Sequence, residues 1–296
     1  MTPRIRAAIL VALAAACFGA MAVFARHAYR VGVDPLALLF IRFSLAAAVL
    51  VPVMAAYRTP WPQRRALGAL VLMGGLGYVS QSLSFFSALQ YAPAALVALL
   101  LYLHPVLIAL AGRYVMGEAM GFHRAASIAV ALIGTAFVLG FSHSAQWQGY
   151  ALGVLAAVLY SIYLMTGQSV LARVAPLAAA TTVIVSAAGV FGVLCLATTP
   201  QWPTTPESWG AAVAIAIVST VFAILLLFAG MRVLGATDAA TISMLEPVVT
   251  AFLGVWLLGE SLSVFQWIGI GLVVAAVIRL VRRGAPQPTD VSPSRK

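Results

Sequence analysis

Apolar residues form long uninterrupted runs in this chain, separated by short segments that carry proline, glycine and arginine. A helix needs about 20 apolar residues to cross the hydrocarbon core of a bilayer. The strands of an outer-membrane barrel would alternate every second residue instead. The continuous runs therefore predict an all-α membrane protein with ten transmembrane helices, at residues 7–26, 35–57, 66–89, 94–116, 122–141, 148–168, 178–199, 209–232, 237–258 and 264–281.

Composition supports a protein that lies in the lipid bilayer. The 296 residues are 63% hydrophobic and 8% charged, with a mean hydropathy of +1.05. The net charge of +10 could indicate nucleic-acid binding, but most basic residues fall at one set of helix ends. Because basic residues concentrate on the cytosolic side, this distribution predicts a bacterial inner-membrane protein with both termini, including the tail 284–296, in the cytosol. We expect no nucleic-acid partner.

The chain repeats itself after 142 residues. Residues 103–118 align with 245–260 at 7 identical positions of 16, including Pro105 with Pro247. The shift divides the chain into two five-helix repeats, 7–141 and 149–281. Because each repeat has an odd number of helices, the second is predicted to be inverted in the membrane. Inverted repeats are typical of secondary transporters, whose substrate sites lie near the midplane between the repeats.

Several matched segments resemble one known family. Leu245-Glu246-Pro247-Val248 and Leu257-Leu258-Gly259-Glu260 are similar to the second repeat of EamA-type proteins, in the drug/metabolite transporter superfamily. The segment 85–91, with Pro105 and Gly117-Glu118, is similar to the first. The resemblance implies ten helices and export of small metabolites, amino acids among them. His104 stands before Pro105, where most members of the family have an apolar residue. In this respect the chain resembles the aromatic amino acid exporters of the superfamily, which carry bulky aromatic residues around this place.

Glu246 is the first candidate site residue. It lies nine residues into its predicted helix, about 13 Å along the axis. A carboxylate at that depth is costly unless it is paired, protonated or in contact with water, so substrate binding or proton coupling is one interpretation. The other is structural, because Pro247 frees a backbone carbonyl that a protonated Glu246 could satisfy.

His104 occupies the matched position in the first repeat. It could face an aqueous cavity beside Tyr102, or it could be a hydrogen-bonded structural residue. A metal site is disfavoured, because no other histidine or carboxylate follows at helical spacing. We expect no cofactor.

Two further helices carry polar and aromatic stripes. Tyr78, Gln81, Ser82 and Phe85 share one face of the third helix, which suits either a cavity or hydrogen bonds between helices. Tyr160 and Tyr163 lie one turn apart in the sixth helix, and Phe18 is the repeat partner of Tyr160. Such rings could hold a planar substrate by stacking.

Other charged residues are expected to be structural. Arg42 could extend to the lipid headgroups or pair with Asp34. Glu118 and Glu260 occupy matched Gly-Glu turns, where a carboxylate favours the next helix N-terminus.

The absent motifs narrow the function further. The chain has no phosphate-binding loop for nucleotide hydrolysis, and no nucleophile, metal set or acid pair that predicts an enzyme. No cation at the midplane is evident from the sequence, which favours a neutral or zwitterionic substrate over an anionic one.

We therefore predict a secondary active exporter of amino acids, aromatic ones among them, working by alternating access in the lipid bilayer. A multidrug or other metabolite exporter of the same fold is the alternative. The predicted substrate-binding residues are Phe18, Tyr78, Gln81, Tyr102, His104, Tyr160, Tyr163 and Glu246.

Overall fold

The computed structural model describes residues 2–30, 32–88, 90–115, 120–140, 146–259 and 261–283. Within these ranges the chain is helical and has no β-strand. The elements in chain order are α1 (Pro3–Arg30), α2 (Pro35–Ala56), α3 (Arg64–Leu72), η1 (Met73–Tyr78), α4 (Val79–Ala88), α5 (Ala94–Leu101), α6 (His104–Val115), α7 (Phe122–Leu139), α8 (Trp147–Leu171), α9 (Pro176–Ala197), α10 (Pro206–Ala216), η2 (Ile217–Phe222), α11 (Ala223–Leu234), α12 (Ala236–Ser243), α13 (Glu246–Leu258) and α14 (Val264–Arg283).

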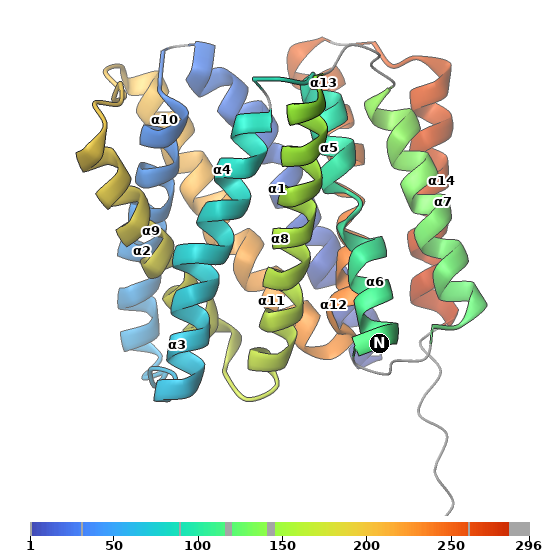
Figure 1. Ribbon diagram of the computed structural model, residues 1–296, viewed down its shortest axis with the longest axis horizontal. Coiled ribbons are helices and arrows are strands. Elements are labelled where there is room, and N and C mark those ends of the chain that lie inside the picture. The colour runs from blue at the N-terminus through green and yellow to red at the C-terminus, as the bar shows by residue number, and fades with distance from the viewer. Residues whose placement is uncertain are drawn as a thin grey trace, which may run out of the picture.

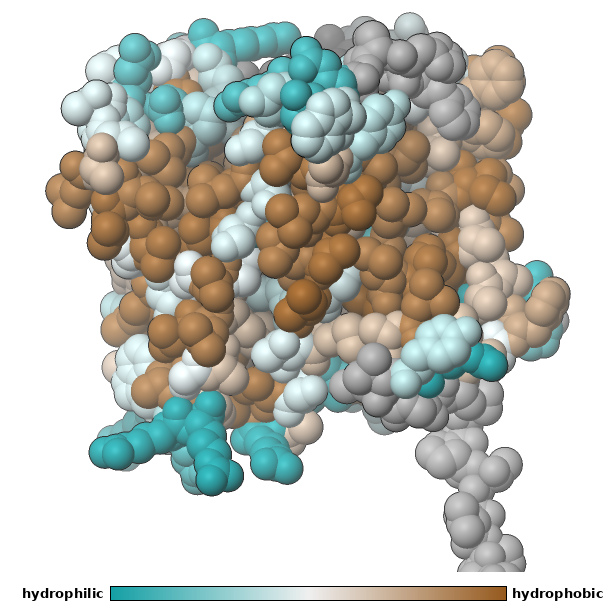
Figure 2. Space-filling view, viewed as in Figure 1, coloured by the Kyte–Doolittle hydropathy of each residue, from teal (hydrophilic) through white to brown (hydrophobic). Residues whose placement is uncertain are grey.

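The described helices form ten segments that are long and apolar enough to cross a membrane. This confirms the predicted all-α membrane fold. Figure 2 shows the physical basis, a broad band of hydrophobic residues bordered by hydrophilic residues at both ends of the bundle. The predicted tail 284–296 and the capping residues Glu118 and Glu260 lie outside the described residues.

Four of the ten spans are interrupted near their middle. The third and eighth each contain a short π-helix, η1 and η2, in which the backbone takes one extra residue per turn. The fourth and ninth each break into two helices, α5–α6 and α12–α13, separated by two residues. Breaks at membrane depth are tolerated where protein or water, rather than lipid, satisfies the freed backbone groups.

The two groups of five spans interleave extensively. The largest helix contacts are α7 with α14, α1 with α11, α2 with α9, and α4 with α8, and each joins a helix of the first group to one of the second. Helix α1 is central, since it also packs against α10, α12 and α13 (Figure 1). We call the end of the bundle where α1 begins and α14 ends the terminal end, which is lower in Figure 1.

Close helix approach depends on glycines. Helices α7 and α14 meet at Gly134 and Gly269, where a Cβ on Gly269 would lie 2.5 Å from the Gly134 carbonyl oxygen. In lipid, close van der Waals packing replaces much of the hydrophobic driving force, and small residues are what allow it.

We expect Gly269→Val to destabilise the protein by about 1–3 kcal/mol, because the new side chain would force the two backbones apart. Gly271→Ala is the matched control in the same helix, since nothing lies within 4 Å of its added Cβ. Thermal unfolding in detergent measures both, and equal midpoints for the two variants would contradict the packing argument.

Candidate functional site

The two matched prolines start the second part of a broken span. Pro105 and Pro247 each occupy the second position of α6 and α13. Proline is tolerated there because the first turn of a helix has no partner for its backbone N–H. His104 and Glu246 are consequently the first residues of these helices, inside the bundle, where the positive end of the helix dipole favours a carboxylate.

Aromatic rings connect the π-helix η1 of the third span with the break between α5 and α6 in the fourth span. The ring centroids of Tyr78 and Tyr163 are 5.8 Å apart, and those of Tyr163 and Tyr160 are 5.9 Å apart with the rings nearly parallel. Tyr160 contacts the His104 ring at 4.8 Å, and His104 lies 6.2 Å from Tyr102. Five of the predicted site residues, from the third, fourth and sixth spans, thus form one continuous group of rings.

Arg42 reaches the other end of this group. Its side chain is only 3% exposed, and its Nη2 donates to the Tyr78 hydroxyl at 3.0 Å. Its Nε donates to the Thr220 hydroxyl at 2.6 Å, and its guanidinium lies 4.8 Å from the centre of the Phe43 ring. The expectation that Arg42 extends to the headgroups or pairs with Asp34 is therefore wrong. Asp34 instead caps α2 by accepting from the Leu36 backbone N–H.

The contacts of Arg42 join two matched positions. Tyr78 and Thr220 are 142 residues apart, the period of the sequence repeat. Tyr78 ends η1 and Thr220 lies within η2, so one guanidinium links both π-helices. The Thr220 hydroxyl also donates to the Ile215 carbonyl at 3.0 Å. Among the described residues Arg42 Nη1 makes no hydrogen bond, which leaves donors for a ligand.

Glu246 lies at the opposite side of the ring group. Its carboxyl interacts electrostatically with the Tyr102 hydroxyl and with Arg42. Gly19 permits the close approach of α1, since a Cβ there would lie 2.7 Å from the Glu246 carbonyl oxygen. This approach places α1, and with it the half-buried Phe18, against the start of α13.

His104 has one occupied and one open ring nitrogen. Its Nδ1 donates to the Leu101 carbonyl at 2.9 Å, because a carbonyl oxygen can only accept. Its Nε2 is buried and has no hydrogen-bond partner among the described residues. In the neutral ring this atom is an acceptor, so it suits an N–H or O–H group of a ligand.

Three predicted site residues lie outside the ring group, and Gln81 is the third of these, after Glu246 and Phe18. It is buried one turn beyond Tyr78, and the Ser82 hydroxyl contacts its carbonyl oxygen at 3.5 Å. In the part of the chain that the structure describes, no group of three or more His, Cys, Asp or Glu side chains could hold a metal ion.

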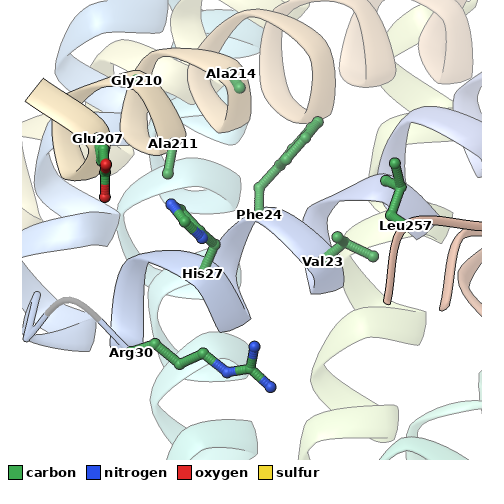
Figure 3. Close-up of a pocket in the computed structure, with 9 residues that line it drawn as sticks. All are labelled: Val23, Phe24, His27, Arg30, Glu207, Gly210, Ala211, Ala214 and Leu257. Carbon is green, nitrogen blue, oxygen red and sulfur yellow. The ribbon is translucent and has the colours of Figure 1, made fainter. Parts of the chain in front are cut away.

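A separate hollow of about 430 Å³ opens at the end of the bundle opposite the terminal end. It lies between α1 and the helices α10 and α13, as Figure 3 shows. Its residues on α1 are Val23, Phe24, His27 and Arg30, on the helix face opposite Phe18.

Ten spans, interrupted helices and buried polar residues at the interruptions define the class as a multi-pass membrane transporter fold. The chain belongs to the EamA-like transporter family, whose sequence pattern matches residues 5–140 and again 147–282. The family resemblance inferred from the matched motifs is confirmed.

Relatives support the same class. The uncharacterized transporter YcbK of Bacillus subtilis (strain 168) is 28% identical over 288 residues, covering 89% of this chain and 88% of the relative. An uncharacterized transporter of Archaeoglobus fulgidus is 23% identical, covering 90% and 93%. A protein of known crystal structure has the same fold, with a TM-score of 0.82 at 24% identity, covering 92% of this chain and 97% of that one.

Sequence reasoning missed the role of Arg42 and Thr220. An arginine inside an apolar run was itself a signal, since intramembrane charges are functional candidates by default. The repeat was a second signal, because it aligns Thr220 with the predicted site residue Tyr78.

We expect Thr220→Val to destabilise the protein by about 1–3 kcal/mol, because the buried guanidinium would lose an acceptor. Thr182→Val is the matched control, since that buried hydroxyl only returns a hydrogen bond to the Ala178 carbonyl of its own helix. Thermal unfolding in detergent compares them, and a loss in the control as large as that in Thr220→Val would refute the assignment.

Proposed function

We propose that this transporter is a secondary active exporter of small zwitterionic metabolites, with amino acids, aromatic ones among them, as substrates. The observation that carries the proposal is that a buried cation, Arg42, and a half-buried carboxylate, Glu246, flank one group of aromatic rings. An amino acid at neutral pH carries the complementary pair of charges. The cation that the sequence did not predict therefore strengthens the zwitterionic interpretation.

Arg42 is suited to hold the carboxylate of the substrate. A guanidinium binds a carboxylate through paired N–H groups, and Thr220 and Tyr78 fix its orientation from two sides. The donors on Nη1 are the ones left for the ligand. In an interior of low dielectric this contact is stronger than it would be in water.

Glu246 is suited to hold the ammonium group. Its carboxylate offers the charge, and Tyr160 and Tyr102 lie close enough to interact with it electrostatically. Aromatic rings attract cations, so these tyrosines are suited to a site for an ammonium group. The stacked pair Tyr160 and Tyr163 could support an aromatic side chain of the substrate. Glu246 is also the group that could exchange a proton, which makes protons the candidate coupling ion.

Alternating access follows from the proposed inverted repeats, because two near-equivalent halves can exchange roles at small energetic cost. The charge distribution of the sequence supports a bacterial inner membrane with the terminal end in the cytosol. In this orientation the hollow between α1, α10 and α13 opens to the outside.

We expect purified protein in liposomes to show counterflow, in which preloaded unlabelled amino acid accelerates uptake of the labelled one. A pore would show no acceleration. The panel should contain aromatic and aliphatic amino acids, nucleosides and cationic drugs. Transport restricted to cationic drugs would reject the amino acid proposal in favour of the multidrug alternative.

The charge assignment is tested with an amino acid, its amide and its deaminated acid as competitors. We expect Arg42→Gln to weaken binding of the amino acid about 10- to 100-fold, the value of a hydrogen-bonded charged group. The amide, which has no carboxylate, should be almost unaffected. Arg173→Gln, an exposed arginine at the terminal end, is the control. Equal losses for the amino acid and its amide would show that Arg42 does not contact the carboxylate.

Proton coupling is tested with Glu246→Gln. We expect the variant to lose stimulation by a pH gradient, because glutamine cannot exchange a proton, and its rate should vary little across a pH series. Glu207→Gln, an acid at the other end of the bundle, should keep the wild-type profile. An unchanged rate and profile in Glu246→Gln would eliminate the coupling role.

A further inference from the structure

A buried carboxylate joins three helices at the terminal end. Asp238, in the first turn of α12, is 1% exposed. Its Oδ2 pairs with Arg4 Nη2 of α1 at 2.5 Å, and its Oδ1 pairs with Arg124 Nε of α7 at 2.9 Å. Each carboxylate oxygen thus has its own guanidinium partner.

The ion pairs cross between the two groups of five spans. Helices α1 and α7 belong to the first group, and α12 belongs to the second. Removing a partner would leave a buried, uncompensated charge, so separating these helices at the terminal end is costly. Gln168 of α8 further fixes α12 in place, because its Oε1 accepts from the Ala236 backbone N–H at 2.6 Å.

The opposite end of the bundle is arranged differently. There a hollow of about 430 Å³ is lined by residues of α1, α10 and α13. His27 on α1 and Glu207 on α10 point toward one another across it in Figure 3, but no ion pair joins them in the described ranges. In the described ranges, buried ion pairs therefore join the two groups at the terminal end, and a hollow lies between helices of the two groups at the other end.

The difference between the two ends of the bundle is also present in the sequence repeat. The positions matched to Asp238, Arg4 and Arg124 are Leu96, Gln146 and Gln266, and none carries a charge. Gln266 donates from its side chain to the Val138 carbonyl at 3.2 Å, and Leu96 packs in a small apolar cluster. When the transporter changes to the state in which the opposite end is closed, an equivalent set of ion pairs cannot form at these positions.

We propose that Asp238, Arg4 and Arg124 form a lock that closes the terminal end and biases the substrate-free transporter toward the state open at the opposite end. The proposal rests on alternating access as part of the proposed function. The two states of a symmetric carrier would be nearly equal in free energy, and the lock stabilises one of them. In the proposed orientation the free exporter rests closed toward the cytosol.

The lock affects how the substrate binds from the cytosol. For an exporter that loads from the cytosol, the ion pairs must open before loading, so they reduce the apparent affinity on that side by the fraction of locked protein. Asp238 is a positioning residue in this mechanism, because it lies outside the ring group that is proposed to contact substrate.

The test measures distances at both ends without any transport assay. Spin labels are placed on exposed positions in a cysteine-free background, at Ile5 and Ala172 for the terminal end and at Tyr29 and Trp209 for the other. In lipid nanodiscs, we expect Asp238→Asn to shift the ratio of the two states about tenfold, within the usual range of a conformational coupling. The terminal pair should lengthen while the opposite pair shortens.

Two controls separate the lock from general destabilisation. Glu207→Gln removes an acid from the hollow, and it should leave the terminal distance unchanged. Asp238→Glu keeps the charge and should recover most of the wild-type distribution. Broadening of both distances without opposite shifts would indicate a merely structural role for Asp238, and unchanged distances in Asp238→Asn would overturn the proposal.

Transplanting the lock provides an independent test. In the Asp238→Asn background, Leu96→Asp with Gln146→Arg and Gln266→Arg should favour closure of the opposite end. A distance shift with no amino acid transport would support the lock and reject the substrate assignment. Amino acid transport with unchanged distances would support the substrate assignment and reject the lock.

Discussion

The cost of placing charge in lipid is the constraint on which this structure depends. A charged side chain within the membrane must find partners inside the protein, because hydrocarbon offers none. Arg42 satisfies this requirement with two hydroxyls and an aromatic ring. Its position therefore requires α2, η1 and η2 to meet at one point, and the same meeting point brings Tyr78 and Tyr163 together.

Interruption of the helices is a second consequence of the same constraint. Pro105 and Pro247 start new helices inside the bundle, which turns His104 and Glu246 toward protein instead of lipid. The π-helices shift the register of the third and eighth spans, so that Tyr78 and Ser219 both present an oxygen to Arg42. Irregular backbone occurs where the polar chemistry is, as expected when each freed group must be satisfied internally.

The proposed function depends on differences between matched positions of the repeat. Arg42 matches Ile184, His104 matches Glu246, and Asp238 matches Leu96. Because of the first two differences, the charges in the interior are distributed asymmetrically. A cation lies on one side of the ring group and a carboxylate on the other. The third makes the two ends of the bundle unequal. A protein built from two identical halves could have neither property.

The amino-acid sequence by itself determined the helical membrane fold, the ten spans, the period of the repeat and the family. These follow from hydropathy and spacing, which are local properties of the chain. It also indicated six of the residues that meet in the interior: Tyr78, Tyr102, His104, Tyr160, Tyr163 and Glu246.

Only the tertiary structure decided where Arg42 and Asp238 point. The side chain of Arg42 could extend to the lipid headgroups or turn inward, and the acceptors that hold it inward are on spans remote in sequence. The partners of Asp238 are 234 and 114 residues away. Periodicity cannot determine such contacts, because they depend on which helices pack together and how deeply each is placed.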